Sequence, residues 1–365
     1  MRSRTGRALS TGLAATAGIA TLIAVTSGRA RAHVDYVRNE SGEFIPLLRL
    51  IVEVLSHPVN LAFFLGGGVV VGVAVGGYLY VRPRFRDVEV LRETLDGYRD
   101  LVPWMLRLAI GLPLVGAGFS GYFFSPVVGV QSRLLQVGIG FLLLFGLATR
   151  FVAALGLLAY LVGLVFHPRL LLALEYVPGF LAIVLAGSGR PSADHMLQQV
   201  ASADRTLYGR IDPIHHLAAW FHARIDPFET YIPTVLRIGV GVSFIYLGGV
   251  QKLIQSGEAL VVVHRYNLEA LLPITAKAWV FAAGVTEIAL GIALILGLFT
   301  RGVAAVSFFM FTVTLFALAN DPVLAHIPLF GLASAIFTLG AGPLAFDTRI
   351  GSVPTSHGSQ ASGTD

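Results

Sequence analysis

A lysine and a glutamate lie in apolar stretches of the sequence, where charged side chains are rare. Glu287 lies inside VTEIALGIALILGLFTR, and Lys252 ends LRIGVGVSFIYLGGVQK. If both stretches are helices, Lys252, which is 15 residues after Arg237, lies about 23 Å from one end. Glu287, 14 residues before Arg301, lies at about 21 Å, a similar depth. Because an isolated charge in hydrocarbon costs about 3 kcal/mol or more, we expect Lys252 and Glu287 to form an ion pair.

The sequence contains few other residues that point to chemistry. It has no cysteine, which excludes thiolate nucleophiles, disulfide exchange and cysteine-ligated metal clusters. It has no phosphate-binding loop, no zinc-protease HExxH motif and no nucleophile elbow. The glycines at 66–68 and 248–249 lie inside apolar stretches, where helical backbone amides are already bonded, so they do not form a phosphate cradle. We expect no metal site.

The composition indicates a membrane protein. Of the 365 residues, 55% are hydrophobic and 13% are charged. Soluble domains average about 25% charged residues, so this chain is typical of integral membrane proteins. The 26 basic residues exceed the 21 acidic ones, and we interpret this excess as a topology signal. We therefore expect a lipid bilayer around the chain and no nucleic-acid partner.

Apolar stretches of spanning length recur along the chain. A helix needs about 20 apolar residues to cross about 30 Å of hydrocarbon. The sequence therefore predicts an all-α, polytopic fold with nine membrane spans. These cover residues 59–81, 102–124, 134–149, 151–167, 174–187, 234–251, 278–299, 302–319 and 327–342.

The distribution of arginines predicts the topology. Five arginines lie between residues 82 and 100, directly after the first span. Because basic loops stay in the cytoplasm, we expect a multi-pass protein of the cell membrane with its N-terminus outside and its C-terminus inside. Arg107, Arg237 and the arginines at 150 and 301 lie near the cytoplasmic helix ends. We interpret them as snorkelling side chains that anchor the helices.

The N-terminal 32 residues have the features of a signal peptide. Arginines precede an apolar run, which ends at residues 30–32, Ala-Arg-Ala, a small-x-small cleavage pattern. The alternative is an uncleaved first span, because the apolar run is long for a signal peptide. An extracytoplasmic segment, one transmembrane helix and a cytoplasmic basic loop follow at residues 33–100.

The rest of the chain contains an internal repeat. QVGIGFLLLFGLATR (136–150) aligns without gaps on EIALGIALILGLFTR (287–301), with six of fifteen positions identical. GSGRPSAD, further on, mirrors GAGPLAFD. The sequence therefore predicts two four-helix units in parallel orientation, which we call the first unit (101–194) and the second unit (234–347). A cytoplasmic or interfacial connector (195–233) joins them, and a disordered tail (348–365) ends the chain.

The second unit carries an ordered set of motifs. These are an arginine near the start of its first helix, GGVQKL at that helix's end, HRYNLEALLP in the next loop and then TEIALGIALILGLFTR. In these features it resembles the DoxX family of membrane proteins. The first unit, with GYFFSP and the same Thr-Arg turn, resembles the DoxD-type subunit of thiosulfate:quinone oxidoreductase. The resemblance implies membership of membrane oxidoreductase assemblies, some of which pass electrons to quinone.

Each unit has a set of three polar residues at matching places. The set consists of Lys252, Glu287 and His326 in the second unit and of Tyr122, Gln136 and Glu175 in the first. One interpretation is a structural Lys252–Glu287 pair that holds four helices in register. The other is a quinone pocket, for which all six residues are candidates. In it, Lys252 and His326 would hydrogen-bond a quinone carbonyl, and Glu287 would take up or release its proton.

We expect a membrane subunit or anchor of a quinone-linked oxidoreductase, linked to sulfur or thiosulfate chemistry, with no covalently bound cofactor. A redox partner subunit would carry the electron-transfer centres. Two alternatives remain open, namely a small-molecule transporter and a non-enzymatic membrane scaffold or assembly factor. Homo-oligomers and hetero-oligomers are both compatible with the sequence.

Overall fold

The computed structural model describes residues 45–81, 86–130, 132–203, 223–318 and 323–350. The predicted signal peptide and nearly all of the predicted tail lie outside these residues. So do residues 204–222 of the connector, which include His215, His216 and His222.

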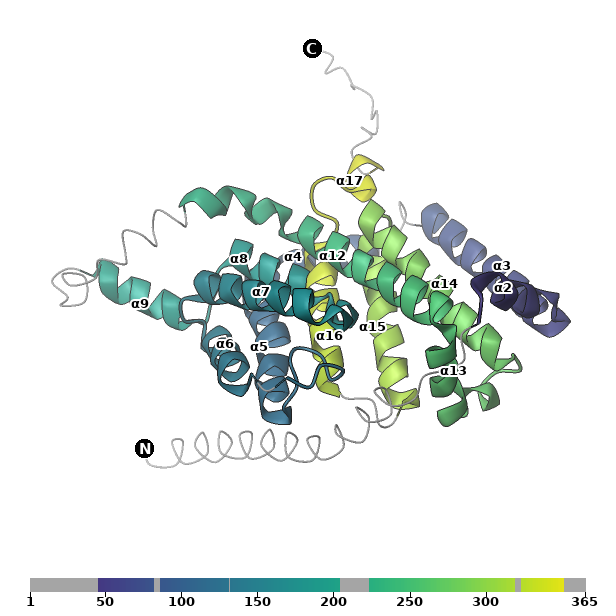
Figure 1. The fold of residues 1–365 in the computed structure, drawn as a ribbon. Coiled ribbons are helices and arrows are strands. Elements are labelled where there is room, and N and C mark those ends of the chain that lie inside the picture. The colour runs from purple at the N-terminus through teal and green to yellow at the C-terminus, as the bar shows by residue number, and fades with distance from the viewer. Residues whose placement is uncertain (1–44, 82–85, 131, 204–222, 319–322, 351–365) are drawn as a thin grey trace, which may run out of the picture.

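The regular elements of the described residues are helices (Figure 1). Six are long and apolar enough to cross a membrane: α3 (Pro58–Val81), α5 (Val102–Ser120), α7 (Thr149–Phe166), α12 (Ile232–Tyr246) with its continuation η4 (Leu247–Ile254), α14 (Ala276–Leu296) and α15 (Thr300–Ala317). Three shorter apolar helices are α6 (Arg133–Phe145), α8 (Tyr176–Ala186) and α16 (Val323–Leu339). The predicted all-α, polytopic membrane fold is therefore confirmed.

The nine predicted spans correspond to these helices, although only six reach spanning length by themselves. Shorter elements connect them: α2 (Leu47–Ser56), α4 (Arg86–Asp96), η1 (Arg99–Leu101), η2 (Pro168–Ala173), α9 (Ala193–Ser202), η3 (Asp226–Tyr231), α13 (Ser256–Arg265), η5 (Leu268–Ala270) and α17 (Phe346–Ile350). The predicted sidedness of the chain stays a prediction.

Paired glycines bring the first two long helices of each unit into backbone contact. A Cβ on Gly111 of α5 would lie 2.9 Å from the carbonyl oxygen of Gly140 on α6. In the second unit, a Cβ on Gly241 of α12 would lie 2.7 Å from the carbonyl oxygen of Gly291 on α14. Small residues of this kind let two helices approach closely within a membrane.

The Thr-Arg sequence of each unit forms the same turn. The preceding helix ends at a left-handed glycine, Gly146 or Gly297, with φ 68° in both units. The first backbone amides of the following helix donate to a carboxylate at the unit's end, which is Asp194 at α7 and Asp347 at α15. An acidic side chain at a helix N-terminus satisfies amides that have no partner inside the helix.

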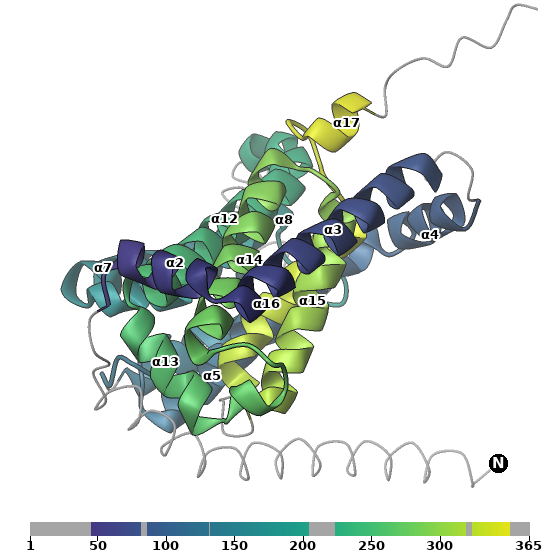
Figure 2. The same cartoon turned by 90° about the vertical axis from the view of Figure 1, so that its right-hand side faces the viewer.

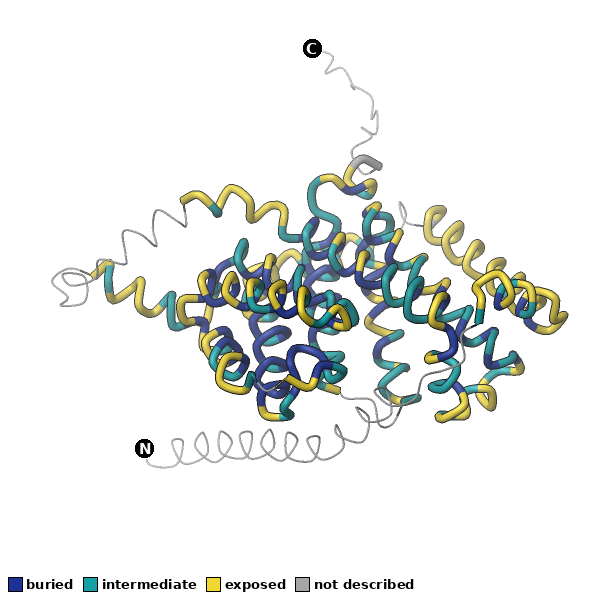
Figure 3. Tube along the Cα trace, viewed as in Figure 1, coloured by how far each residue is buried: buried dark blue, intermediate teal, exposed yellow. Residues whose placement is uncertain are grey.

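The two units share one hydrophobic core. α16 packs along α5, where a Cβ on Gly331 would lie 2.1 Å from the Cβ of Ala109. α8 packs on α12, where a Cβ on Gly239 would lie 2.3 Å from the Cβ of Pro178. The largest cluster of buried apolar side chains draws residues from both units. Figure 3 shows the buried segments in the centre of the molecule.

The leading helices α2 and α3 lie along the outside of the bundle, on the side shown in Figure 2. Only 6% of the apolar window of α3 is buried. Gly68, Gly72 and Gly76 form a stripe of glycines spaced four residues apart along α3, and nothing lies within 4 Å of a Cβ placed on any of them. This glycine stripe therefore faces away from the described part of the chain.

Candidate functional site

Lys252 and Glu287 form an ion pair between η4 and α14. The Nζ atom of Lys252 lies 2.7 Å from Oε1 and 2.7 Å from Oε2 of Glu287. One ammonium group therefore donates to both oxygens of the carboxylate. The prediction that these two side chains form an ion pair is confirmed.

Two glycines beside the pair explain why the helices meet so closely there. A Cβ on Gly248 of η4 would lie 2.5 Å from the carbonyl oxygen of Gly284 and 3.0 Å from the Cβ of Glu287. A Cβ on Gly284 of α14 would lie 3.0 Å from the carbonyl oxygen of Gly248. Any larger residue at either position would push Lys252 away from Glu287.

Lys252 belongs to a π-helical segment. η4 (Leu247–Ile254) continues α12 with this wider turn. π-helical turns are rare in proteins and frequently occur at functional sites. The extra residue in the turn changes the direction in which the following side chains point, so Lys252 does not lie where a regular α-helix would place it.

The pair remains partly accessible in apolar surroundings. The exposed fraction is 25% for the Lys252 side chain and 13% for the Glu287 side chain. Val285, two residues before Glu287 on α14, is 42% exposed. Because a lone charge in hydrocarbon costs about 3 kcal/mol or more, each group depends on the other.

The matching residues of the first unit form no ion pair. Gln136 donates from Nε2 to the carbonyl oxygen of Tyr122 over 2.6 Å, and its Oε1 accepts from the amide of Phe124 over 2.8 Å. The amide group of Gln136 therefore holds the backbone of the loop after α5. This geometry favours a structural role for Gln136.

Glu175 is buried at the start of α8 without a basic partner. Its exposed fraction is 4%, and its Oε2 has no hydrogen-bond partner among the described residues. The nearby Tyr160 hydroxyl donates its hydrogen bond to the carbonyl oxygen of Leu170 over 2.7 Å, and it therefore does not donate to Glu175. The first unit therefore has a buried acid but lacks the lysine of the second unit.

His326 is half-buried on the first turn of α16. This turn packs against the first unit, since a Cβ on Gly116 of α5 would lie 2.6 Å from Leu324. Asp321, its neighbour in sequence, lies outside the described residues. The grouping of His326 with the Lys252–Glu287 pair stays a prediction. Within the described chain there is no group of three or more His, Asp or Glu side chains arranged to hold a metal ion.

The arginines at the opposite helix ends are not snorkelling side chains. Arg107 and Arg237 are each only 1% exposed. Arg237 donates to five carbonyl groups, those of Leu294, Ile295, Ala341, Pro343 and Leu344. Arg107 donates to the carbonyl oxygen of Pro191, and its Nε and Nη1 have no partner among the described residues. The snorkelling interpretation is wrong for these two side chains, because both are buried and bind carbonyl oxygens of helix ends and turns.

The Thr-Arg arginines connect the two units reciprocally. Arg150 of the first unit binds Asp226 at 2.9 Å and Glu229 at 3.3 Å, in η3, which leads into the second unit. Arg301 of the second unit binds Asp96 at 2.9 Å, at the end of α4, which leads into the first unit. These acidic partners were not recognised in the sequence. The sequence signal that could have identified them is the acidic segment that precedes each of the two units.

Comparison with known proteins identifies one part of the chain. The family model of DoxX matches residues 232–320, from the first residue of α12 to beyond the end of α15. The match includes Lys252 and Glu287, and it does not include the first unit or His326. No curated protein and no solved structure matches the chain. Residues 232–320 are therefore a DoxX family domain within a polytopic membrane protein.

Proposed function

We propose that this chain is a membrane subunit or anchor of a quinone-linked oxidoreductase, in which the Lys252–Glu287 pair binds quinone. The observation that carries the proposal is the pair itself. It joins an acid and a base inside the apolar part of the DoxX domain, on a π-helical segment, and it remains 25% and 13% exposed. Ionisable residues inside a membrane are candidates for functional sites.

The chemistry of the pair suits a quinone. A quinone is apolar except for two carbonyl oxygens, which accept hydrogen bonds. The Lys252 ammonium has three N–H donors. Two of them lie on the Glu287 oxygens, which leaves one for a quinone carbonyl. Reduction to the quinol consumes two electrons and two protons, and Glu287 in its protonated form would be a proton donor beside that carbonyl.

A partner subunit would supply the electrons. The chain has no cysteine, so it cannot ligate an iron–sulfur cluster through thiolates. In the proposed assembly, a partner carries the redox centres and this chain holds quinone near them. Sulfur or thiosulfate oxidation is the proposed source of electrons, since the first unit resembles the DoxD-type subunit.

We also propose that the first unit is a diverged DoxX-like unit that arose by tandem duplication. Equivalent residues make equivalent contacts in the two units, which supports this proposal. The glycine pairs Gly111–Gly140 and Gly241–Gly291 are one example. A family profile built from close relatives of residues 101–194 would test it, because such a profile should also match residues 232–320 and should fail to do so if the two units are unrelated.

Quinone reduction in membranes tests the proposed function. Membranes from a strain that lacks this chain would be complemented with the wild type, with Glu287→Gln or with Glu175→Gln, and thiosulfate would be one electron donor. We expect Glu287→Gln to reduce the rate of quinone reduction at least about tenfold, because it removes the ionisable group at the pair. Glu175→Gln is the matched control and should keep the wild-type rate. Full activity of Glu287→Gln at equal membrane abundance would reject the proposal.

The scaffold alternative rests on the same pair. Both oxygens of Glu287 are already bonded to Lys252, which is also the geometry of a purely structural contact. A scaffold would keep its function when the charged pair is replaced by the apolar pair Lys252→Met and Glu287→Leu, since apolar side chains suit these surroundings. A quinone site would lose its function in the same double variant.

A further inference from the structure

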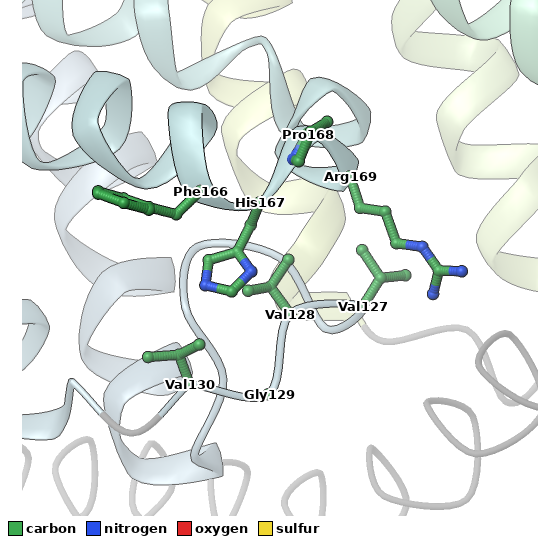
Figure 4. A pocket seen from close by; sticks show the side chains of 8 residues that line it. All are labelled: Val127, Val128, Gly129, Val130, Phe166, His167, Pro168 and Arg169. Atoms are coloured by element: carbon green, nitrogen blue, oxygen red, sulfur yellow. The ribbon is translucent and has the colours of Figure 1, made fainter.

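A cleft lies at one end of the first unit, where α7 meets η2 (Figure 4). Its volume is about 360 Å³, and it is lined by the loop 127–130 and by residues 166–169. Ligand sites in proteins commonly range from about 300 to about 1,000 Å³. The cleft is therefore large enough for a small polar group. It lies in the first unit and is distinct from the Lys252–Glu287 pair in the second unit.

Two basic side chains belong to this cleft. Figure 4 shows the ring of His167 directed toward the loop 127–130, beside Val128. Arg169 extends past Val127, with its guanidinium group directed away from His167. Among the described residues, neither side chain has a hydrogen-bond or ion-pair partner. Two basic groups without acidic partners therefore border one cleft, which favours an anionic ligand.

The surface beside the cleft is apolar and open. Phe166, which ends α7, is 74% exposed, and Val165 before it is 78% exposed. α7 has spanning length, so these side chains lie near one boundary of the hydrocarbon. Val130, on the opposite wall, is 37% exposed. The cleft thus lies where the apolar flank of a membrane helix meets its polar end.

We propose that this cleft binds the phosphodiester headgroup of an anionic membrane lipid. The phosphate lies between His167 and Arg169, and the acyl chains follow the exposed flank of α7 at Phe166. Arg169 closes on the phosphate by rotation of its flexible side chain, and its planar guanidinium can then donate two parallel hydrogen bonds. Basic groups near the membrane surface attract anionic lipid headgroups through their charge. A free phosphate ion shares the headgroup's charge but lacks the acyl chains.

Lipid titration of the purified full-length protein in detergent tests the proposal. Native mass spectrometry would count bound phosphatidylglycerol in the wild type, Arg169→Gln and Arg169→Glu. We expect one retained lipid in the wild type, about tenfold weaker binding in Arg169→Gln and still weaker binding in Arg169→Glu, because the charge is first removed and then reversed. Arg133→Gln is the matched control. Arg133 lies in the same unit at the start of α6, over the ring of Phe119 at 4.7 Å, and does not line the cleft.

Two further arms identify the ligand. Zwitterionic phosphatidylcholine should bind at least about tenfold more weakly than phosphatidylglycerol, and inorganic phosphate alone should not compete with it. An equal loss of binding in Arg133→Gln would overturn the proposal, since it would indicate general surface attraction. So would tight phosphatidylglycerol binding to Arg169→Glu. Competition by inorganic phosphate would identify a site for free anions instead. Each variant must keep the wild-type melting temperature in detergent without added lipid, which separates lost binding from lost folding.

Discussion

In the second unit, Lys252 donates to both carboxylate oxygens of Glu287, whereas the matching Tyr122 and Gln136 of the first unit are joined through the backbone of a loop. The backbone differs at the same place. α12 continues into the π-helical η4, while α5 ends at Gly121, a left-handed glycine with φ 77°. The first unit therefore uses this region to fix a loop, and the second uses it to hold two opposite charges together.

At their other ends the two units agree closely. Each has a left-handed glycine before its Thr-Arg turn, a carboxylate that caps the next helix and a buried arginine that donates to backbone carbonyl groups. The end of each unit that carries the Thr-Arg turn is therefore a scaffold common to both units. The other end is where the units differ in the groups they offer to a ligand.

The largest expected effect concerns the buried arginines, Arg107 and Arg237. It tests whether these two matching arginines contribute equally to the stability of their units. Arg237 donates to five carbonyl groups and Arg107 to one. Arg237→Met should reduce the free energy of unfolding by about 3 to 5 kcal/mol, because it leaves several buried carbonyls without donors. Arg107→Met should cost about 1 kcal/mol. Unfolding of both variants in mixed micelles would measure this, and equal losses would contradict the difference in bonding.

The second prediction breaks the charged pair of the second unit. Lys252→Met and Glu287→Leu should each reduce the free energy of unfolding by about 2 to 3 kcal/mol, because each leaves an unpaired charge in apolar surroundings. The double variant should recover most of that loss, with a coupling of about 1 to 3 kcal/mol. Glu175→Gln in the first unit should change stability little, because no basic side chain of the described chain pairs with Glu175. Additive effects of the two single substitutions would show that the pair is not coupled.

The third prediction concerns the helix caps shared by both units. Asp194→Ala and Asp347→Ala should each cost about 1 kcal/mol, since each carboxylate accepts from two amides at a helix start. Asp194 also accepts from the hydroxyl of Thr149 over 2.8 Å, whereas the hydroxyl of Thr300 has no partner among the described residues. Asp194→Ala should therefore be slightly the more costly change. Thermal unfolding would rank the two variants by stability. The reverse order would show that the hydrogen bond between Thr149 and Asp194 contributes nothing.

The smallest expected effect is a dependence of the stability of α2 on pH. α2 packs on α14 of the second unit, and in the described part of the chain the first unit has no such helix on its surface. Glu53 of α2 binds Lys277 of α14, and this contact, followed by Arg49, holds the pKa of Glu53 below its usual range. Because the pKa of Glu53 is lowered in the folded state, its contact with Lys277 stabilises the packing of α2 on α14 at pH values above the ordinary pKa of glutamate. This help is lost as the pH falls through the folded-state pKa.

Hydrogen exchange in α2 would measure this loss. Between about pH 6 and about pH 3, protection of α2 should fall more than intrinsic exchange chemistry explains. Glu53→Gln should show weak protection at both pH values and no added dependence on pH. Protection that is independent of pH in the wild type would contradict the assigned role of Glu53.

The pairing of Lys252 with Glu287 was predictable because a charge in apolar surroundings needs an opposite charge. The π-helical turn at Lys252 was not predictable, since it depends on the close contact of Gly248 with Gly284 across two helices. The burial of Arg237 was missed for a related reason. A sequence shows an arginine near a helix end, but it does not show the carbonyl groups of a distant turn that the arginine binds.

The packing between the units was also beyond the sequence. The repeat indicated two similar bundles, but residues such as Gly331 and Ala109 reveal their contact only when α16 lies against α5. The resemblance of the second unit to DoxX is confirmed for residues 232–320, which the family model matches, and the match does not extend over the rest of that unit. The similarity of the first unit to a DoxD-type subunit stays a proposal.

Direct quinone binding tests the central claim, that the second unit holds a quinone at its charged pair. A short-chain quinone would be titrated into the purified protein in lipid nanodiscs, with the wild type, Glu287→Gln and Glu175→Gln measured side by side. The account predicts saturable binding to the wild type and to Glu175→Gln, and at least about tenfold weaker binding to Glu287→Gln. Equal affinity in all three proteins, or no saturable binding to the wild type, would contradict it.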